Sequence, residues 1–259
     1  MQVRQPALAE LLAFCAESPV ERVFLEDLAR RGLGRFTACS ENNGRLTASC
    51  HVGANAVPSG GGCEAFAGAV AARGPRMIVG EEGAVRDLWG AVRRRVAPPR
   101  QVRPGQPVYV LDEPPPAGRT RLRRATRADL GLLLPACAAA HQAELGVDPL
   151  THGPSGFRRR TESQIQQGRS WLWEERGTIL FKAEASAWTQ SAIQLQQVWV
   201  DPRTRRKGYA LRGLRDLCRL LLRQVPAVCL FVRAENAPAI GLYERVGMRR
   251  EGSYRSILL

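Results

Sequence analysis

Val198-Trp199-Val200-Asp201-Pro202 opens the most informative part of this sequence, and a basic turn follows it as Arg205-Arg206-Lys207-Gly208-Tyr209-Ala210. The apolar triplet predicts the end of a β-strand, because proline has no amide hydrogen for a strand ladder. The turn leads directly into a segment whose apolar residues recur at steps of three and four, with arginines on the opposite side. We therefore expect a strand, a tight turn and an amphipathic helix.

The turn before this helix has the composition of a phosphate-binding site. The first turn of a helix leaves amide groups unpaired and carries the positive end of the helix dipole. Gly208 lets the backbone approach a ligand closely, and Arg205, Arg206 and Lys207 add positive charge. These features predict a cradle for a pyrophosphate group. The alternative is an ordinary solvated turn that precedes a helix.

A second segment, residues 228–248, is predicted to form a strand followed by a short capped helix. Asn236 suits the N-cap position, Pro238 the first helical turn, and Gly247 the left-handed residue that ends the helix. Tyr243 lies two helical turns after Asn236 and points the same way. A tyrosine at this position is either a core residue with a satisfied hydroxyl or a phenol available for proton transfer.

In this order the two segments resemble the GNAT superfamily of acyl-CoA-dependent N-acyltransferases. The family's cofactor motif appears as Arg205-x-x-Gly208-x-Ala210, and its later motif as Asn236-x-x-Ala239-x-x-Leu242-Tyr243-x-x-x-Gly247-Met248. Met248 departs from the usual phenylalanine, which affects packing rather than chemistry. The close resemblance covers residues 120–259. The layout of the whole chain looks like that of a bacterial group with a GNAT-like half before a complete GNAT domain.

The resemblance implies a cofactor and the roles of the residues around it. Acetyl-CoA is the implied cofactor, held by the turn 205–210 and by Asn236. In the family, the strands equivalent to 192–200 and 228–233 splay apart, and the backbone groups of Val198, Trp199 and Val200 bind the pantetheine arm. The amide of Val198 is then placed to stabilise the charge that develops on the reacting carbonyl, and Tyr243 is the matched proton donor to the leaving thiolate.

The general base is less well defined by the sequence. A lysine-like amine has a pKa of ~10.4, so deprotonating it near pH 7 costs roughly 4–5 kcal/mol. Glu184 lies inside an apolar strand, where an unpaired carboxylate is costly, so it is either the base or the partner of a salt bridge. Gln196 and Gln197 occupy the strand where many relatives keep a carboxylate.

Residues 1–111 repeat the order of elements found in residues 119–259, with residues 112–118 as a proline-rich linker. We predict an α/β (α+β) protein with two tandem GNAT-like domains, each a central mixed, mostly antiparallel sheet flanked by helices. In the first half Pro58-Ser59-Gly60-Gly61-Gly62 takes the place of the cofactor turn and contains no basic residue. No asparagine-to-tyrosine motif follows it. A phosphate cradle formed by the three glycines is the less favoured alternative; this half is interpreted as a degenerate, non-catalytic copy that shapes the substrate cleft or an interface.

Composition and residue spacing exclude several other classes. The 259 residues are 44% hydrophobic and 24% charged, as in ordinary globular proteins. The sequence has neither a signal pattern nor an apolar run of ~18 residues, which predicts a cytoplasmic protein without a membrane partner. Its seven cysteines contain no CxxC pair, and neither they nor the three histidines have metal-ligand spacing. We expect buried thiols and no metal site.

The charge is concentrated in the second half. Residues 1–118 hold 14 arginines and 12 acidic residues, a net charge of +2, whereas residues 119–259 account for the remaining +12 of the chain's +14. Such an excess attracts anionic ligands. Nucleic acid is the less favoured partner, because the sequence has no recognition-helix, zinc-finger or aromatic RNA-binding motif. The oligomeric state stays open, with a homodimer as one option.

The sequence thus predicts an acetyl-CoA-dependent N-acetyltransferase that acts on a primary amine, such as a small molecule or a peptide, by direct attack. Two alternatives stay open. One is a CoA-binding regulatory or assembly protein without turnover, and the other is a basic nucleic-acid-associated protein on the same scaffold. The sequence does not identify the acceptor amine or the length of the acyl chain.

Overall fold

The computed structural model describes residues 3–42 and 44–259. The strands of its first half are β1 (Val3–Arg4), β2 (Arg35–Ser40), β3 (Leu46–Val52), β4 (Asn55–Gly60), β5 (Met77–Glu81) and β6 (Gln101–Leu111). Those of its second half are β7 (Arg123–Arg124), β8 (Ser170–Glu175), β9 (Thr178–Trp188), β10 (Ala192–Trp199), β11 (Ala227–Phe231) and β12 (Arg249–Leu258).

Helices connect the strands in each half. The first half contains α1 (Leu8–Ala16), α2 (Val23–Arg30), the 3-10 turn η1 (Cys63–Phe66), α3 (Ala67–Arg73) and α4 (Glu82–Val92). The second contains η2 (Arg127–Asp129), α5 (Leu130–Leu145), α6 (Pro154–Gln166), η3 (Pro202–Thr204), α7 (Tyr209–Leu221) and α8 (Ala237–Val246). The mixed α/β fold class is confirmed.

All strands of the described residues join one sheet, in the order β1-β2-β3-β4-β5-β12-β6-β11-β10-β9-β8-β7. Two neighbouring pairs are parallel, β4 with β5 and β10 with β11, and the other pairs are antiparallel. Each half therefore repeats one pattern: two helices, three antiparallel strands, a crossover helix, a parallel strand, a helix and a final strand. The tandem GNAT-like architecture predicted from the sequence agrees with this repeat.

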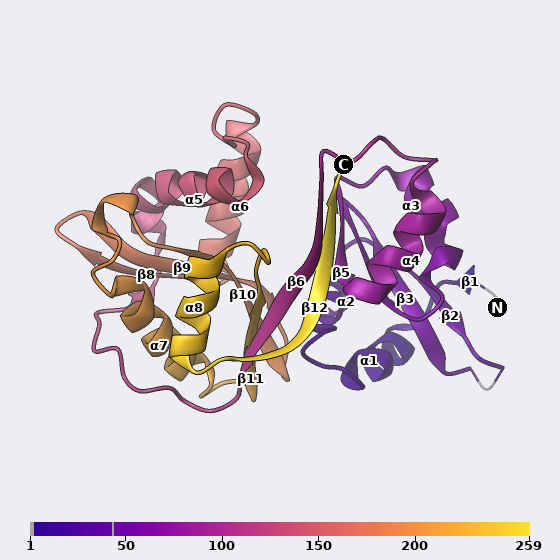
Figure 1. Cartoon of the computed structure of the whole chain (residues 1–259), viewed down its shortest axis with the longest axis horizontal. Coiled ribbons are helices and arrows are strands. Elements are labelled where there is room, and N and C mark those ends of the chain that lie inside the picture. The colour runs from indigo at the N-terminus through magenta and orange to yellow at the C-terminus, as the bar shows by residue number, and fades with distance from the viewer. Residues whose placement is uncertain (1–2, 43) are drawn as a thin grey trace.

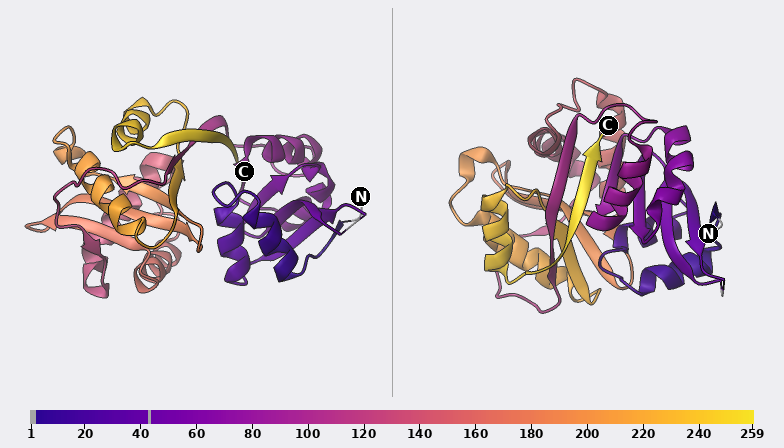
Figure 2. Two further views of the ribbon diagram at one scale, coloured as in Figure 1. Left: turned by 90° about the horizontal axis from the view of Figure 1, so that it is seen from below. Right: turned by 45° about the vertical axis from the view of Figure 1, so that its right-hand side comes forward.

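The two halves exchange their final strands. β6, at the end of the first half, pairs with β11 of the second, while β12, at the end of the chain, pairs with β5 of the first. β6 and β12 also pair with each other along most of their length, so they lie side by side between the halves (Figure 1). Figure 2 shows the same two strands joining the two helix-covered parts of the sheet. The halves are consequently one hydrogen-bonded unit.

Three sequence-based expectations differ from the structure. The segment Pro58–Gly62 is not a loop throughout, because β4 continues to Gly60 and pairs with β3. The sequence predicts a helix over residues 128–145 that Pro135 kinks or splits, but helix α5 continues through Pro135; it loses one hydrogen bond there, and its packed face holds the helix together. No element was predicted for residues 249–258, which form β12. The sequence also predicts a hairpin turn at Asn42-Asn43-Gly44, and Asn43 lies outside the described residues.

The linker is extended but packed against the second half. Asp216 of α7 accepts a hydrogen bond from the amide of Gly118 at 2.6 Å, and Arg219 donates to the carbonyl of Pro115 at 2.8 Å. Arg212 donates to the carbonyl of Gly118 at 2.9 Å. A side chain at position 118 would meet the backbone of Arg212 at 1.9 Å, so only glycine fits there. The linker therefore runs along α7 as a fixed part of the fold.

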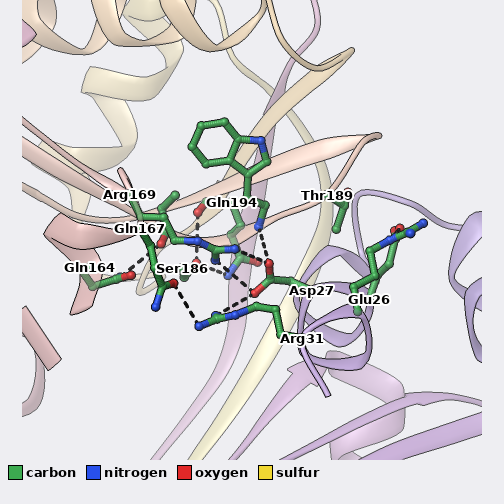
Figure 3. A network of polar contacts seen from close by, with 12 residues as sticks. Glu26, Asp27, Arg31, Gln164, Gln167, Arg169, Ser186, Thr189 and Gln194 are labelled. Carbon is green, nitrogen blue, oxygen red and sulfur yellow. Dashed lines mark hydrogen bonds and ion pairs between the residues drawn. The ribbon is translucent and has the colours of Figure 1, made fainter. Parts of the chain in front are cut away.

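A buried ion pair also joins the halves (Figure 3). Asp27 of α2 accepts two hydrogen bonds from Arg169, at 3.1 and 2.6 Å, and a third from the amide of Trp188 in β9 at 3.2 Å. Arg31 adds a bond to Asp27 at 3.2 Å and another to Gln167 at 3.0 Å. Asp27 and Arg169 are both buried. The carboxylate of Asp27 is thus the polar centre of the contact between α2 and the second half.

Replacing Asp27 with asparagine is expected to lower the free energy of unfolding by about 3–5 kcal/mol, because Arg169 is then left as a buried cation without an anion. Urea unfolding of the whole chain measures this change. Glu162→Gln serves as the control, since it breaks the exposed Arg158–Glu162 pair and should leave the unfolding midpoint unchanged. Equal midpoints for both variants would show that Asp27 does not hold the halves together.

Three properties concern the whole described chain. All seven cysteines are buried free thiols, as expected. In residues 3–42 and 44–259, no helix is both long enough and apolar enough to cross a membrane. No cluster of three or more histidine, cysteine, aspartate or glutamate side chains in the same residues has the arrangement of a metal site.

Candidate active site

Strands β10 and β11 lie parallel at first and then part. Residues 192–194 of β10 pair with residues 227–229 of β11. Beyond this point β11 continues beside β6 and β10 beside β9, so the facing edges of β10 and β11 no longer bond to each other. Val198 and Trp199 end β10, and Val200 follows it. These three predicted cofactor residues therefore lie on the diverging segment, where their backbone groups face the opening between the strands.

The end of β10 contains a β-bulge. Gln196 is opposite Glu184 and Trp199 is opposite Lys182, so three steps along β10 match two along β9. Within the extra length, Gln197 has φ +49°, a left-handed conformation that is uncommon for a residue other than glycine. The bulge changes the direction of the backbone immediately before Val198.

The basic turn leads from β10 into α7 as predicted. Gly208 occupies the N-cap with φ +78°, and Arg206 is also left-handed at φ +63°. A Cβ atom at position 208 would meet no heavy atom of the protein within 4 Å, so the space beside this glycine is open. Arg205, Arg206 and Lys207 are exposed, and the amides of the first turn of the 13-residue helix follow directly. Open space, positive side chains and free amides suit a phosphate group.

The next two residues of the turn serve the core as well. Tyr209 and Ala210 are half-buried in the first turn of α7, and the ring of Tyr209 contacts that of Trp173 at 5.2 Å between centroids. Further along the helix, Gly213 packs against Phe181 so closely that a Cβ would lie 2.3 Å from the ring. α7 is therefore fixed tightly on β9, and its N-terminus is held at the end of β10.

The segment from Asn236 to Met248 has the predicted local geometry. The side chain of Asn236 accepts a hydrogen bond from the amide of Ala239 at 3.3 Å and caps α8. Gly247 ends the helix with φ +103°, and the amide of Met248 bonds to the carbonyl of Tyr243 at 3.1 Å. Asn236 thus positions α8, and no contact in the described residues shows a further role for its side chain.

Tyr243 faces the core cluster beneath α7 and α8. Its side chain is only 7% exposed, and its ring lies 5.8 Å from that of Tyr109 in β6. Burial raises the pKa of its hydroxyl well above the usual value, and the nearby carboxylate of Glu144 raises it further. The hydroxyl therefore carries its proton at neutral pH. The exchanged strand β6 forms part of the wall around this residue.

Glu184 is bound by several partners on the other face of the sheet. Its carboxylate forms an ion pair with Lys182 at 3.1 Å and accepts hydrogen bonds from Cys137 at 3.1 Å and Gln196 at 3.2 Å. The guanidinium of Arg160 lies 3.8 Å away. Burial alone would raise the pKa of this carboxyl, but Lys182 and Arg160 together lower it to about 2. Of the two roles left open by the sequence, this geometry favours the ion pair.

Glu144 is a candidate that the sequence did not indicate. It lies in the last turn of α5, and Arg103 of β6 donates a hydrogen bond to its backbone carbonyl at 2.7 Å. Its side chain is exposed to solvent and lies near the guanidinium groups of Arg103, Arg160 and Arg233. No sequence signal marked Glu144, because it becomes a neighbour of Tyr243 only through the fold.

Two families match this chain. Residues 140–248 match the acetyltransferase (GNAT) family, and this range contains the diverging strands, the basic turn and the helix of Tyr243. The chain carries a GNAT acetyltransferase domain. Residues 35–133 match a domain of unknown function, DUF4081. Every site residue predicted from the sequence lies within the GNAT domain, and the GNAT family supports acyl transfer as the general activity.

Solved structures of GNAT proteins share the fold along almost the entire chain. An acetyltransferase of the GNAT family from Colwellia psychrerythraea is 10% identical, with 99% of each chain covered and a TM-score of 0.61. A GCN5-related N-acetyltransferase from Sphaerobacter thermophilus is 19% identical, with 99% of this chain and 93% of that chain covered and a TM-score of 0.62. No curated protein matches the sequence. The similarity therefore extends beyond the GNAT domain into the first half.

Proposed function

We propose that this protein is a cytoplasmic N-acetyltransferase that transfers the acetyl group of acetyl-CoA to a primary amine. The observation that carries the proposal is the divergence of β10 from β11 directly before a basic, glycine-containing turn at the N-terminus of α7. Tyr243 on α8 lies in the same core cluster as α7 and β10. The first half supplies β6 to this site and keeps no cofactor turn of its own.

The described residues fit acetyl-CoA. We assign its pyrophosphate to the turn 205–210, where Gly208 leaves open space and three exposed cations surround the first amides of α7. The diverging backbone of Val198, Trp199 and Val200 offers amide and carbonyl groups to an extended arm, as an added strand would. Asn236 contributes by fixing α8 beside this opening.

The bound cofactor supplies an activated acyl thioester, and the protein supplies positioning and proton transfer. We assign to the amide of Val198, which follows the bulge, the role of stabilising the negative charge that develops on the carbonyl oxygen. The Oη of Tyr243 is assigned as the donor of a proton to the departing sulfur, because α8 holds this side chain in the core cluster shared with α7 and β10.

Glu144 is the better candidate for the general base. A base works best when its pKa lies near the working pH. The carboxyl of Glu184 has a pKa of about 2 and its oxygens are already bonded, which makes it a weak proton acceptor. The side chain of Glu144 is open to solvent, so its carboxylate can receive the proton of an incoming ammonium group.

Gly208→Asp is expected to weaken acetyl-CoA binding about 100-fold or more, because a negative charge then occupies the phosphate site. Titration calorimetry of both proteins measures the change. Gly208→Asn is the matched control: it has the same shape, and asparagine and aspartate both tolerate positive φ. The asparagine variant adds the same bulk without the charge, so its affinity should fall clearly less than that of the aspartate variant. If the aspartate variant binds acetyl-CoA like the wild type, the phosphate lies elsewhere.

The activity itself is tested by following the release of free thiol from acetyl-CoA in the presence of primary amines. The panel should contain polyamines, amino acids, lysine peptides and peptides with free N-termini. Amine-dependent thiol release with a matching acetylated product, identified by mass spectrometry, is the expected result. Tight binding without release by any amine would instead favour a CoA-binding regulatory protein.

A further inference from the structure

Beneath the end of β10 lies a buried polar cluster that the proposed chemistry does not use. Its centre is the ammonium group of Lys182, which is fully buried. The three donors of this group have three acceptors: Cys137 Sγ at 2.9 Å, Glu184 Oε1 at 3.1 Å and Gln197 Oε1 at 2.8 Å. Cys137 in turn donates to Glu184 Oε1 at 3.1 Å. Every hydrogen-bonding group of the ammonium is therefore satisfied.

The three partners of Lys182 come from three different elements of the fold. Glu184 is two residues away on the same face of β9, and Cys137 comes from the middle of α5. These two partners hold the cation in place and balance its charge. Gln197 instead belongs to the bulge of β10 and is the residue with φ +49°. The third donor of Lys182 thus reaches across to the residue whose backbone is strained.

We propose that Lys182 is a positioning residue, whose bond to Gln197 holds the left-handed bulge and thereby sets the backbone of Val198 to Val200. The proposal rests on the proposed function, because the positioned backbone is the segment assigned to the acyl group and the pantetheine arm. A left-handed conformation is costly for a glutamine and persists when the surrounding structure holds it. In the described residues, the bond to Lys182 is the side-chain contact that provides this enforcement for Gln197.

The charges in the cluster support this role. Burial lowers the pKa of Lys182, but the larger combined effect of Glu184 and Cys137 raises it. The carboxyl of Glu184 remains ionised because of Lys182 and Arg160. The ion pair thus keeps a charged donor beneath the bulge, and a hydrogen bond from a charged donor is stronger than one from a neutral group.

A rescue experiment distinguishes positioning from simple support of the core. Lys182→Met keeps most of the apolar chain and removes the donor, and kcat is expected to fall about 10- to 100-fold through misplacement of the Val198 amide. A glycine at position 197 adopts positive φ without strain, so in Gln197→Gly the bulge no longer depends on the hydrogen bond from Lys182. When Gln197→Gly is already present, adding Lys182→Met should therefore lower kcat less than about threefold. Lys182→Met alone also leaves the buried carboxylate of Glu184 without its nearest cation. The same comparison is therefore repeated with Glu184→Gln present.

A measurement without ligand separates this inference from the proposed function. Hydrogen exchange of residues 195–201, followed by mass spectrometry, should become faster in Lys182→Met and return toward the wild-type rate when Gln197→Gly is added. An equal loss of kcat with and without Gln197→Gly, together with unchanged exchange in 195–201, would overturn the positioning role. If the wild type does not bind acetyl-CoA, the proposed function fails, whereas the exchange result still tests the anchor.

Discussion

Tyr243→Phe is expected to lower kcat about 10²-fold or more while acetyl-CoA affinity stays near the wild-type value. The change removes one oxygen from a side chain that is only 7% exposed, so the packing of α8 is preserved. What is lost is the proposed proton donor to the departing sulfur, and general acid catalysis typically contributes a factor of this size. Steady-state rates of thiol release, together with calorimetric titration of acetyl-CoA, measure the two quantities separately.

Tyr109→Phe is the matched control for this experiment. Its ring lies 5.8 Å from that of Tyr243, and its hydroxyl donates to Glu244 at 3.1 Å. The substitution therefore removes a hydroxyl from the same neighbourhood without touching the proposed donor. A small change for Tyr109→Phe and a large one for Tyr243→Phe is the expected pattern. Equal rates for Tyr243→Phe and the wild type would make Tyr243 a core residue only.

Residues 119–259, produced without the first half, are expected not to fold into an active domain. This fragment lacks β6, and the loss exposes the edge of β11 along residues 228–231 and leaves β12 without either of its neighbours. It also lacks Tyr109 and Leu111, which belong to the core beneath α8, and Asp27, which neutralises the buried Arg169. Circular dichroism and thermal unfolding should show no cooperative transition.

Joining the two fragments provides the control for this prediction. Mixing residues 1–118 with residues 119–259 should restore cooperative unfolding, because the exchanged strands and the Asp27–Arg169 pair connect the halves without a continuous chain. Restoration would show that the missing strand, and not the new chain end, caused the failure. A stable, acetyl-CoA-binding 119–259 fragment would contradict the role assigned to β6.

The features that the sequence predicted correctly are those that depend on neighbouring residues. The cap at Asn236, the left-handed stop at Gly247 and the glycine turn before α7 each follow from a few consecutive positions, and each is present in the structure. The periodicity of α7 also identified its buried face, including Leu214, Leu217 and Leu221, because an amphipathic helix shows its core side directly. The order of elements then sufficed to predict the duplicated fold.

The missed features all depend on residues that are distant in the sequence. The exchange of β6 and β12 joins residues about 150 positions apart, and no local pattern reports such a pairing. β12 itself was missed because its first residues, Arg249 to Glu251, are exposed and show no apolar alternation. The cluster around Lys182 and the approach of Glu144 to Tyr243 similarly arise where helix α5 crosses the sheet.

Calorimetric titration of the wild-type chain with acetyl-CoA tests the central claim most directly, because the proposed acyl transfer requires this cofactor at the proposed site between β10 and β11. We predict saturable binding in the micromolar range with one site per chain, since the first half has no basic cofactor turn. Absence of binding at millimolar acetyl-CoA by a folded protein would contradict this claim. Two equivalent sites per chain would contradict the assignment of a silent first half.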